Sequence, residues 1–416
     1  MEFDHGDCLT VSMWTPSLDG THYILIDLHV GAEENPTHAP MLLGTGTPKR
    51  LKSPGPDRTV ELRETHIVLS TGSGSKRAVF FFEWAVRPIL KKLYGEAEVA
   101  KMKVHTTESE TSILELTNDV FFPRANTGKP LRIVLFSGDG GIVDLVNGLS
   151  SKPRSDAYIA PQVVLLPLGT ANALYHSINV ATEENKWGVH TLGSTTAKPL
   201  PIFTATFSPG ARLLVDQARS SQALPKDEHG NGVLHGAVVC SWAVHASIVA
   251  DTDTPEYRSH GVDRFKMAAT EALHPSDGSP PHTYRGRISY LQDGTWHEIE
   301  EKEHAYVLAT MVSNLERPFC VSPRSSPLDG SMHLVHLGPM DGDEVMRIMG
   351  LAYQGGKHVE EEGVRYESID GLRIEVLEGE ERWRRVCVDG KIVRVEEGGW
   401  VEVRKEKSSV LDIVVA

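Results

Sequence analysis

The strongest constraint on the fold is a change in the rhythm of the chain near residue 199. Between residues 61 and 198, short apolar runs such as HIVLS, LRIVLF and QVVLLPL alternate with helix-like segments. After residue 199 the alternation stops, and many short strand-like runs follow, separated by turn residues. Alternating strands and helices are typical of a helix-covered parallel sheet, whereas successive strands indicate antiparallel sheets. We therefore predict an α/β lobe followed by an antiparallel β-sandwich-like lobe, with a ligand site in the cleft between them.

This pattern divides the chain into three segments. Residues 1–60 are predicted to be an N-terminal extension, with strands at CLTVSMW and YILIDLHV and a Pro- and Gly-rich linker over residues 35–57. Residues 61–198 form the predicted α/β domain. Residues 199–416 form the predicted β-rich domain, interrupted by helices near residues 262–273 and 341–353, and residues 217–230 are expected to be a loop.

Composition excludes several classes of protein. Lys and Arg number 42 against 56 Asp and Glu, a formal net charge of −14, which argues against a general nucleic-acid binder. The 4 cysteines lack metal-site spacing, the N-terminus lacks a basic leader, and no stretch of 18 uncharged apolar residues occurs. We expect a cytoplasmic protein whose contact with membranes is peripheral.

Three glycine-bearing turns each follow a predicted strand and precede a predicted helix: STGSGSKR at 70–77, SGDGG at 137–141 and LGTAN at 168–172. Helix N-termini present unpaired N–H groups, and glycine lets a ligand approach the backbone, so turns at one sheet edge can cradle phosphate. The alternative is that glycine is simply common where strands turn into helices. The chain contains no GxxxxGK[ST], no HRD or DFG and no GxGxxG in these turns, which argues against P-loop enzymes, protein kinases and dinucleotide dehydrogenases.

The segment SGDGGIVDLVNGL resembles the signature of the diacylglycerol kinase catalytic domain, found in a superfamily of lipid kinases. VVLLPLGTANALYHSI looks like the segment that follows the signature in those enzymes. HIVLSTGSGSKRA and VHTTES stand where the family has its first glycine loop and a Thr-Glu-bearing strand end. The resemblance implies an α/β three-layer lobe of the NAD-kinase or diacylglycerol-kinase type.

The second half of the chain is similar to one branch of this superfamily. SWAVHASIVADTDTPEYRSHGVDRFKMA and TYRGRISYL resemble segments of sphingosine kinases, and SPLDGSMHLVHLG and VCVDGK match the family's closing elements. These elements occur in family order from roughly residue 64 to 402. The resemblance is therefore nearest to sphingosine and other long-chain-base kinases.

What the resemblance implies is transfer of the γ-phosphoryl group of ATP, with Mg²⁺, to the primary hydroxyl of a lipid, with a sphingoid base as the first choice of acceptor. Diacylglycerol or ceramide is the alternative acceptor. A second alternative is a catalytically weak pseudokinase that binds lipid or nucleotide. A third, an NAD kinase, shares a similar glycine loop but fits the β-rich half less well.

The resemblance also assigns residues. Asp139 would accept the hydroxyl proton, the alternative being that it caps a helix. Asp253, or else Asp251, would meet the amino-alcohol head of the lipid. Arg258 and Arg264 would clamp phosphate, unless they are only a solvated helix face. The complete nucleotide-binding set is Ser70, Thr71, Gly72, Ser73, Gly74, Thr107, Ser137, Gly138, Gly140, Gly169, Thr170, Asn172, Arg258, Arg264, Asp389 and Gly390.

The chain departs from the family pattern at a few positions. Ser70-Thr71 replaces an Asn-Pro pair, Ala171 replaces a glycine, and Lys391 replaces the Glu of the closing VDGE element. The change at Lys391 reverses a charge near the expected nucleotide. These departures motivate the pseudokinase alternative and leave the fold prediction untouched.

Overall fold

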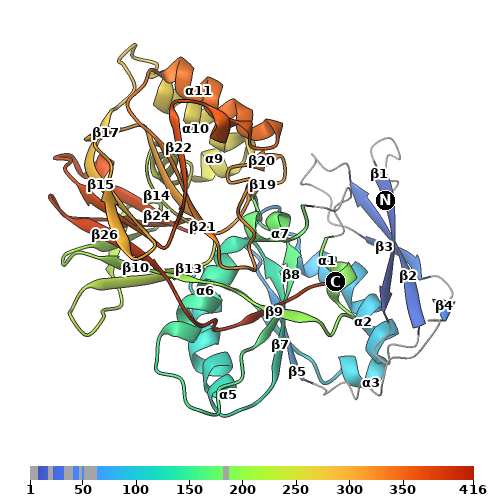
Figure 1. Cartoon of the computed structure of the whole chain (residues 1–416). Coiled ribbons are helices and arrows are strands. Elements are labelled where there is room, and N and C mark those ends of the chain that lie inside the picture. The colour runs from blue at the N-terminus through green and yellow to red at the C-terminus, as the bar shows by residue number, and fades with distance from the viewer. Residues whose placement is uncertain (1–7, 17–21, 32–40, 46–48, 51–62, 181–186) are drawn as a thin grey trace. The chain divides into compact units, whose positions relative to one another are not determined.

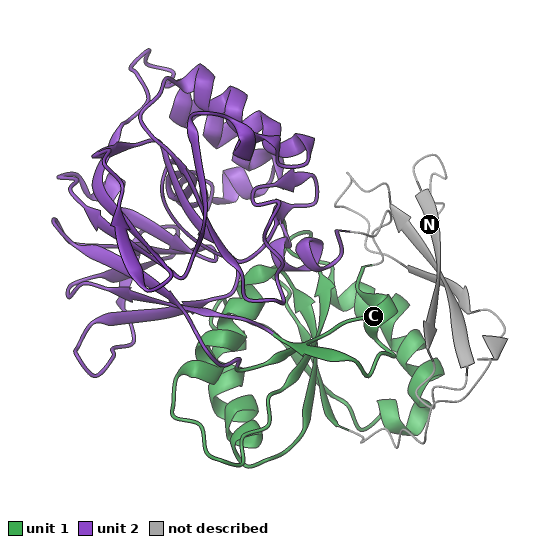
Figure 2. Ribbon diagram, in the orientation of Figure 1, with its two compact units in different colours: residues 1–170, 181–199, 410–416 green, residues 171–180, 200–409 purple. Residues whose placement is uncertain are grey.

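The computed structural model describes residues 63–180 and 187–416, together with the backbone of residues 8–16, 22–31, 41–45 and 49–50. The chain forms two compact units. Unit 1 comprises residues 1–170, 181–199 and 410–416, and unit 2 comprises residues 171–180 and 200–409 (Figure 2). Residues 171–180 and 410–416 thus lie in a different unit from the rest of their predicted domains.

Four N-terminal strands form an antiparallel sheet: β1 (Cys8–Pro16), β2 (His22–Gly31), β3 (Met41–Thr45) and β4 (Lys49–Arg50). The first two confirm the predicted strands. The other two lie inside the predicted linker, so that prediction was wrong for them. The Pro and Gly residues on both sides of MLLGT concealed a short strand; the remainder of the predicted linker lies outside the described residues.

Unit 1 contains a six-stranded sheet with the order β6-β5-β7-β8-β27-β9. All neighbouring strands are parallel except β9, which runs antiparallel to β27. The strands are β5 (Glu64–Leu69), β6 (Lys103–Thr106), β7 (Leu131–Ser137), β8 (Gln162–Pro167), β9 (Ala197–Pro199) and β27 (Asp412–Val414). The last strand comes from the end of the chain, which explains why residues 410–416 lie in unit 1.

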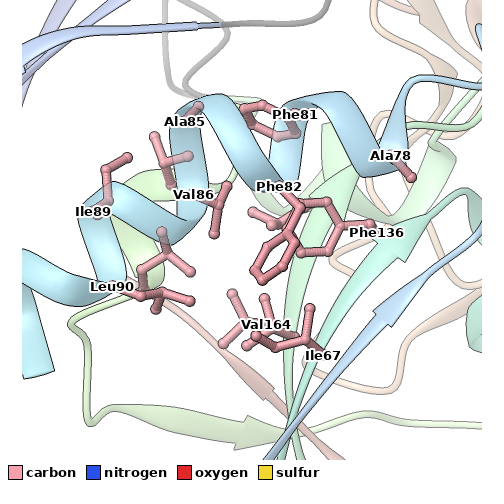
Figure 3. Packing of buried hydrophobic residues seen from close by; sticks show 14 of the residues in the cluster. Ile67, Ala78, Phe81, Phe82, Ala85, Val86, Ile89, Leu90, Phe136 and Val164 are labelled. Atoms are coloured by element: carbon pink, nitrogen blue, oxygen red, sulfur yellow. The ribbon is translucent and has the colours of Figure 1, made fainter. Parts of the chain in front are cut away.

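Helices cover both faces of this sheet (Figure 1). One face carries α1 (Ala78–Phe81), the π-helical η2 (Phe82–Val86), α2 (Arg87–Tyr94) and α3 (Glu96–Val99). Figure 3 shows Phe81 and Phe82 packed with Ile67, Phe136 and Val164 of the strands. The other face carries α4 (Ser112–Leu116), η3 (Thr117–Phe121), α5 (Phe122–Asn126) and α6 (Asp139–Ser150). This arrangement is the predicted three-layer α/β lobe.

The strand order places a topological switch point between β5 and β7. The chain leaves β5 toward β6 on one side and leaves β7 toward β8 on the other, so the two connections diverge. In open α/β sheets, ligands bind outside the carboxyl ends of the strands at such a point. The first two glycine-bearing turns follow these two strands directly.

Unit 2 is built from two antiparallel sheets, as predicted. The first has the order β12-β11-β25-β24-β14-β18-β21-β22, and the second β13-β10-β26-β23-β15-β16, with β17 beside β15. Trp242 of one sheet lies against Tyr284 of the other, with ring centroids 5.7 Å apart, so the sheets pack face to face. The strands of the first sheet are β11 (Arg212–Val215), β12 (Ser220–Ala223), β14 (Val239–Ala243), β18 (Tyr306–Thr310), β21 (Met332–Leu337), β22 (Val364–Ile369), β24 (Arg385–Val388) and β25 (Lys391–Arg394). Those of the second are β10 (Phe203–Phe207), β13 (Gly232–Gly236), β15 (Tyr284–Gln292), β16 (Thr295–Glu298), β17 (Glu303–His304), β23 (Gly371–Val376) and β26 (Trp400–Lys405).

The helices of unit 2 match the prediction in part. The predicted helices are confirmed as α10 (Asp263–Leu273) and α11 (Gly342–Gly350). Helix α8 (Val244–Asp251) was missed, because its apolar sequence reads equally well as a buried strand. The predicted loop at 217–230 was wrong where β12 pairs with β11. Shorter elements of unit 2 are α7 (Ala173–Ile178), α9 (Pro255–Arg258), β19 (Asn314–Glu316), β20 (Phe319–Cys320), η5 (Leu351–Gln354), η6 (Lys357–Glu360) and η7 (Glu381–Arg384). The short helix η4 (Val189–Thr191) belongs to unit 1.

The described residues contain no helix with the length and apolar character needed to cross a bilayer.

Candidate functional site

The three glycine-bearing turns meet at one edge of the unit 1 sheet. The backbone N–H of Ser70 donates to the carbonyl of Phe136 (3.0 Å), and the N–H of Leu168 donates to the carbonyl of Ser137 (3.2 Å). Gly74 lies so close to the third turn that a Cβ there would come within 2.3 Å of the Leu168 carbonyl oxygen. The turns therefore converge, which is the geometry that a phosphate cradle requires.

Hydroxyl groups connect the first turn to its neighbours. The Oγ of Ser73 lies 2.8 Å from that of Ser70 and 3.2 Å from that of Ser137. Thr71 donates its backbone N–H to Thr107 Oγ1 (3.0 Å) and its hydroxyl to the Thr107 carbonyl (2.8 Å). Five side chains predicted from the sequence to bind nucleotide are thus brought together. Because hydroxyl groups both donate and accept, they can reorient toward phosphate oxygens.

The glycines of these turns differ in what surrounds them. A Cβ on Gly74 or Gly141 would collide with the protein, at 2.3 Å from Leu168 and 2.6 Å from Ser137 respectively. A Cβ on Gly72 or Gly140 would meet no atom of the other described parts of the chain within 4 Å. The first pair is required by packing of the turns. The second pair leaves open space in front of the backbone.

Asp139 is the first residue of α6, and Gly138 occupies the N-cap position. The alternative that Asp139 caps this helix was therefore wrong. Its half-buried side chain lies at the start of a 12-residue helix, directly after the switch-point strand β7. The partial positive charge of a helix N-terminus favours an ionised carboxylate there.

The third turn leads out of unit 1. Gly169 and Thr170 belong to unit 1 and are half-buried, whereas Asn172 belongs to unit 2. Asn172 holds the N-cap position of α7 with a left-handed backbone (φ 54°) and makes no side-chain cap hydrogen bond. Helix α7 is fixed within unit 2 by Ser177, whose hydroxyl donates to the Asn314 carbonyl (3.1 Å) and accepts from the Asn314 N–H (2.9 Å).

Asp389 and Gly390 form the two-residue turn between β24 and β25. Their φ angles are 47° and 86°, and a tight hairpin turn with positive φ at both positions favours this Asp-Gly pair. The buried Asp389 carboxylate accepts hydrogen bonds from the backbone N–H groups of Ala237 (2.6 Å), Val238 (3.1 Å) and Val239 (2.6 Å). It therefore holds two connections together, and the nucleotide contact predicted for Asp389 and Gly390 stays a prediction.

Asp253, Arg258 and Arg264 lie in one cluster of unit 2. Arg258 donates through Nε (3.0 Å) and Nη2 (2.5 Å) to Asp253 Oδ1. Burial lowers the pKa of the Arg264 guanidinium, the Asp253 charge opposes this shift and the Arg258 charge adds to it. One predicted phosphate clamp, Arg258, is thus paired with a carboxylate that was itself predicted to bind the lipid, and the charge of the same carboxylate acts on Arg264.

Asp251, the alternative lipid-binding carboxylate, forms ion pairs with Arg385 (2.8 Å) and Arg382 (3.1 Å). Both candidate carboxylates are therefore neutralised by arginine. Asp253 is the more exposed of the two, with 47% of its side chain accessible against 34% for Asp251. A cationic ligand would displace a single arginine from Asp253 and two from Asp251.

Ser241, His245 and Tyr306 form a buried polar cluster at the start of α8 that was not predicted from the sequence. The Oγ of Ser241 lies 2.7 Å from His245 Nδ1, and the His245 ring meets Tyr306 edge-on at 5.8 Å. Burial lowers the pKa of His245 to about 4, so it is neutral at pH 7. The buried Tyr306 hydroxyl has no hydrogen-bond partner among the described residues. The one signal in the sequence was the polar residues within the apolar run SWAVHASIV.

Over residues 63–180 and 187–416, no three His, Cys, Asp or Glu side chains gather closely enough to hold a metal ion. Magnesium usually keeps several waters and takes only one or two carboxylates besides substrate phosphates. The described residues are thus compatible with a metal bound together with a phosphate ligand, for which Asp139 is the acidic side chain at the converging turns.

Residues 65–204 match the family model of the diacylglycerol kinase catalytic domain. Human sphingosine kinase 1 is 23% identical over 356 residues, which cover 76% of this chain and 85% of that protein. Rat sphingosine kinase 1 is 24% identical over 325 residues, with 71% and 77% covered. The structure of a diacylglycerol kinase from Bacillus anthracis str. Sterne matches with a TM-score of 0.53 at 13% identity, covering 86% of this chain and 98% of that one. The predicted resemblance to this superfamily, near the sphingosine kinases, is confirmed, and so is the predicted fold class.

Proposed function

We propose, from this relationship to the lipid kinases of the diacylglycerol kinase superfamily, that the chain transfers the γ-phosphoryl group of ATP to the primary hydroxyl of a sphingoid base. The observation that carries the proposal is the convergence of the three turns at the switch point, with Asp139 at the start of α6. Phosphoryl transfer depends mainly on positioning and on charge stabilisation, which such turns can supply.

The turns would bind the nucleotide through backbone and hydroxyl groups. Open space in front of Gly72 and Gly140 lets phosphate oxygens approach the backbone, and Ser73 and Ser137 supply adjustable hydroxyls. ATP would contribute the transferred phosphoryl group, and Mg²⁺ would be held with its phosphates and the Asp139 carboxylate. Gly169 and Thr170 complete the proposed contacts in unit 1.

Asp139 would orient the acceptor hydroxyl and take up its proton. A general base acts within hydrogen-bond distance of the proton that it removes. Its place on the first turn of a rigid helix, next to the turns, keeps the carboxylate in a defined position. The proposal therefore assigns positioning to the turns and proton transfer to Asp139.

A sphingoid base carries an ammonium group, which diacylglycerol and ceramide lack. We assign its recognition to Asp253, the more exposed candidate, whose carboxylate would exchange Arg258 for the lipid ammonium. Arg258 and Arg264 would then be available to phosphate oxygens, which guanidinium groups bind bidentately. The protein would act in the cytoplasm and reach its lipid by peripheral contact with a membrane.

The test uses purified protein with labelled ATP, Mg²⁺ and a panel of sphingosine, ceramide, diacylglycerol and NAD. We expect sphingosine to be phosphorylated, and Asp139→Asn to lower kcat by roughly 100- to 10,000-fold, the usual contribution of a general base. Asp119→Asn, an exposed site on the same unit, is the matched control and should retain full activity. Full activity of Asp139→Asn in a folded protein would remove this residue from the mechanism.

The pseudokinase is the second candidate, and specific residues favour it. Ser70-Thr71, Ala171 and Lys391 depart from the kinase pattern at positions that the family resemblance would put near the nucleotide. Lipid binding without transfer to any member of the panel would support this candidate. Preference for diacylglycerol or ceramide would instead retain the kinase and remove Asp253 from head-group recognition.

A further inference from the structure

Three arginines stand in one row across three neighbouring strands of unit 2. Arg212 of β11 is the register partner of Arg394 of β25, which is in turn the partner of Arg385 of β24. Side chains of directly opposed residues share a face of the sheet, with Cβ atoms about 5 Å apart. Like charges in this arrangement repel one another, so the row is unfavourable unless anions neutralise it.

The carboxylates near this row of arginines are fewer than the guanidinium groups around them. Asp251 accepts from Arg385 (2.8 Å) and Arg382 (3.1 Å), and Glu381 pairs with Arg394. Arg384 lies 3.9 Å from the same Glu381, and among the described residues Arg212 donates only to Ser221, at 3.1 Å to its carbonyl. Within the described part of the chain, four of these guanidinium groups thus share two carboxylates and Arg212 pairs with no carboxylate, although the net charge of the protein is −14. The cluster is a local excess of positive charge on an acidic protein.

One guanidinium of the row is buried with a donor unsatisfied. The Arg385 side chain is 10% exposed; its Nε donates to the Arg382 carbonyl (2.7 Å) and its Nη1 to Asp251. Its Nη2 is buried and has no hydrogen-bond partner among the described residues. An unsatisfied buried donor on a charged group is costly, so an acceptor oxygen at this position would be strongly favoured.

The segment that carries Arg382 and Arg385 is anchored by Trp383, which lies between them. The ring of Trp383 stacks on His282 with centroids 4.0 Å apart and an angle of 10° between the planes. The backbone carbonyl of Trp383 accepts a hydrogen bond from Trp242 Nε1 (3.0 Å). This support holds the backbone that carries Arg382 and Arg385 in place before a ligand arrives, which reduces the entropic cost of binding.

We propose that Arg212, Arg382, Arg385 and Arg394 form a binding site for a phosphate-bearing ligand. The planar donor fork of arginine matches phosphate oxygens bidentately, and a phosphate would supply both the missing negative charge and an acceptor for Arg385 Nη2. Inorganic phosphate and the phosphomonoester head group of a lipid such as phosphatidic acid share this chemistry. The site uses none of the residues assigned to ATP. This proposal therefore does not depend on whether the chain is a kinase.

The test measures binding by the full-length protein at constant ionic strength. Inorganic phosphate is titrated calorimetrically, and vesicles of phosphatidylcholine with or without phosphatidic acid are tested by co-sedimentation. Arg212→Gln with Arg394→Gln removes two charges from partly exposed positions; Arg382→Gln, on a side chain that is 60% exposed, is a milder variant that does not disturb the core. Arg287→Gln with Arg404→Gln, exposed arginines of the other sheet, is the matched control.

We expect at least one probe to bind the wild-type protein, the cluster variants to weaken binding tenfold or more, and the control to bind as the wild type does. Binding of inorganic phosphate identifies a free anion as sufficient, whereas binding only to vesicles with phosphatidic acid identifies a head group. Failure of the wild type to bind either probe would overturn the proposal. Equal binding by the wild type and by Arg382→Gln and the double cluster variant would overturn it as well.

Discussion

Glycine serves two different physical needs in the turns of unit 1, and single residues can separate them. Gly74 has φ +46° and abuts the Leu168 carbonyl, so its missing side chain is a requirement of the fold. Gly140 lies in the first turn of α6, and among the described residues a Cβ there would have no atom from another part of the chain within 4 Å. Its missing side chain leaves open space in front of the turn, where we propose that the nucleotide binds.

Gly74→Ala is expected to lower the free energy of unfolding by about 1–3 kcal/mol, because a left-handed backbone strains any residue with a Cβ. Gly140→Ala should leave stability unchanged or raise it by up to about 1 kcal/mol, because alanine favours the helix. The same substitution should weaken ATP binding, since its methyl group occupies the space in front of the turn. Denaturant unfolding and calorimetric titration with ATP measure the two effects.

The two variants serve as controls for each other. Unchanged ATP affinity in Gly140→Ala would show that the open space does not receive the nucleotide. Unchanged stability in Gly74→Ala would contradict the packing of the first turn against the third.

At the scale of elements, the β24–β25 hairpin shows how one side chain can connect distant parts of unit 2. Asp389 sits in a two-residue turn and accepts from three successive backbone N–H groups, those of Ala237, Val238 and Val239. These donors lie in the connection from β13 to β14. Without Asp389, three buried N–H groups would lose their acceptor.

Asp389→Ala is therefore expected to cost about 3 kcal/mol or more of unfolding free energy, because hydrogen bonds to charged groups contribute roughly 1.5–3 kcal/mol each. Asp293 offers a matched control. It occupies the same position in the Asp-Gly turn between β15 and β16, with φ 49°, and is exposed. Asp293→Ala should change stability far less in the same urea titration. Equal effects of the two substitutions would mean that turn conformation, and not the three hydrogen bonds, determines the loss.

For the whole molecule, buried histidines set the response to acid. Burial lowers the pKa of His336 to about 3 and that of His66 to about 4, and also lowers the pKa of His304, which lies 2.9 Å from His336. These rings are neutral in the folded protein, whereas in the unfolded chain they bind a proton below about pH 6.5. Burial raises the pKa of Glu316 to about 7, which has the opposite effect on stability. The histidines outnumber it.

The contribution of the buried histidines to stability is expected to be fully present above pH 6.5 and to fall as the pH decreases toward 4, by up to about 1.4 kcal/mol per pH unit for each histidine. His336→Gln should reduce this slope by about one proton, whatever its effect on stability at pH 7. His297→Gln, at an exposed position, should leave the slope unchanged. Unfolding free energies measured from pH 7.5 to 5 provide the test, and an identical slope in His336→Gln and the wild type would contradict the assignment.

Local sequence was sufficient for most elements of both units. The alternation HIVLS, LRIVLF and QVVLLPL predicted the parallel strands, and the glycine-bearing turns marked where helices begin. These features depend on residues a few positions apart, whose spacing the sequence displays directly. The turn residues of the candidate site could be named for the same reason, with help from the family resemblance.

Interactions between residues far apart in the chain could not be predicted from local sequence patterns. The last strand, β27, joins the sheet of unit 1 through pairing with β8, some 250 positions earlier in the chain. The Asp389 carboxylate binds N–H groups 150 to 152 residues away, and the arginine row exists only because β11, β24 and β25 are neighbours. Short-range periodicity carries no information about which strands pair or which side chains share a face. These partners are selected when the complete chain folds. Each strand must then pair its backbone groups and bury its apolar face at the same time, and this depends on every other element of the unit.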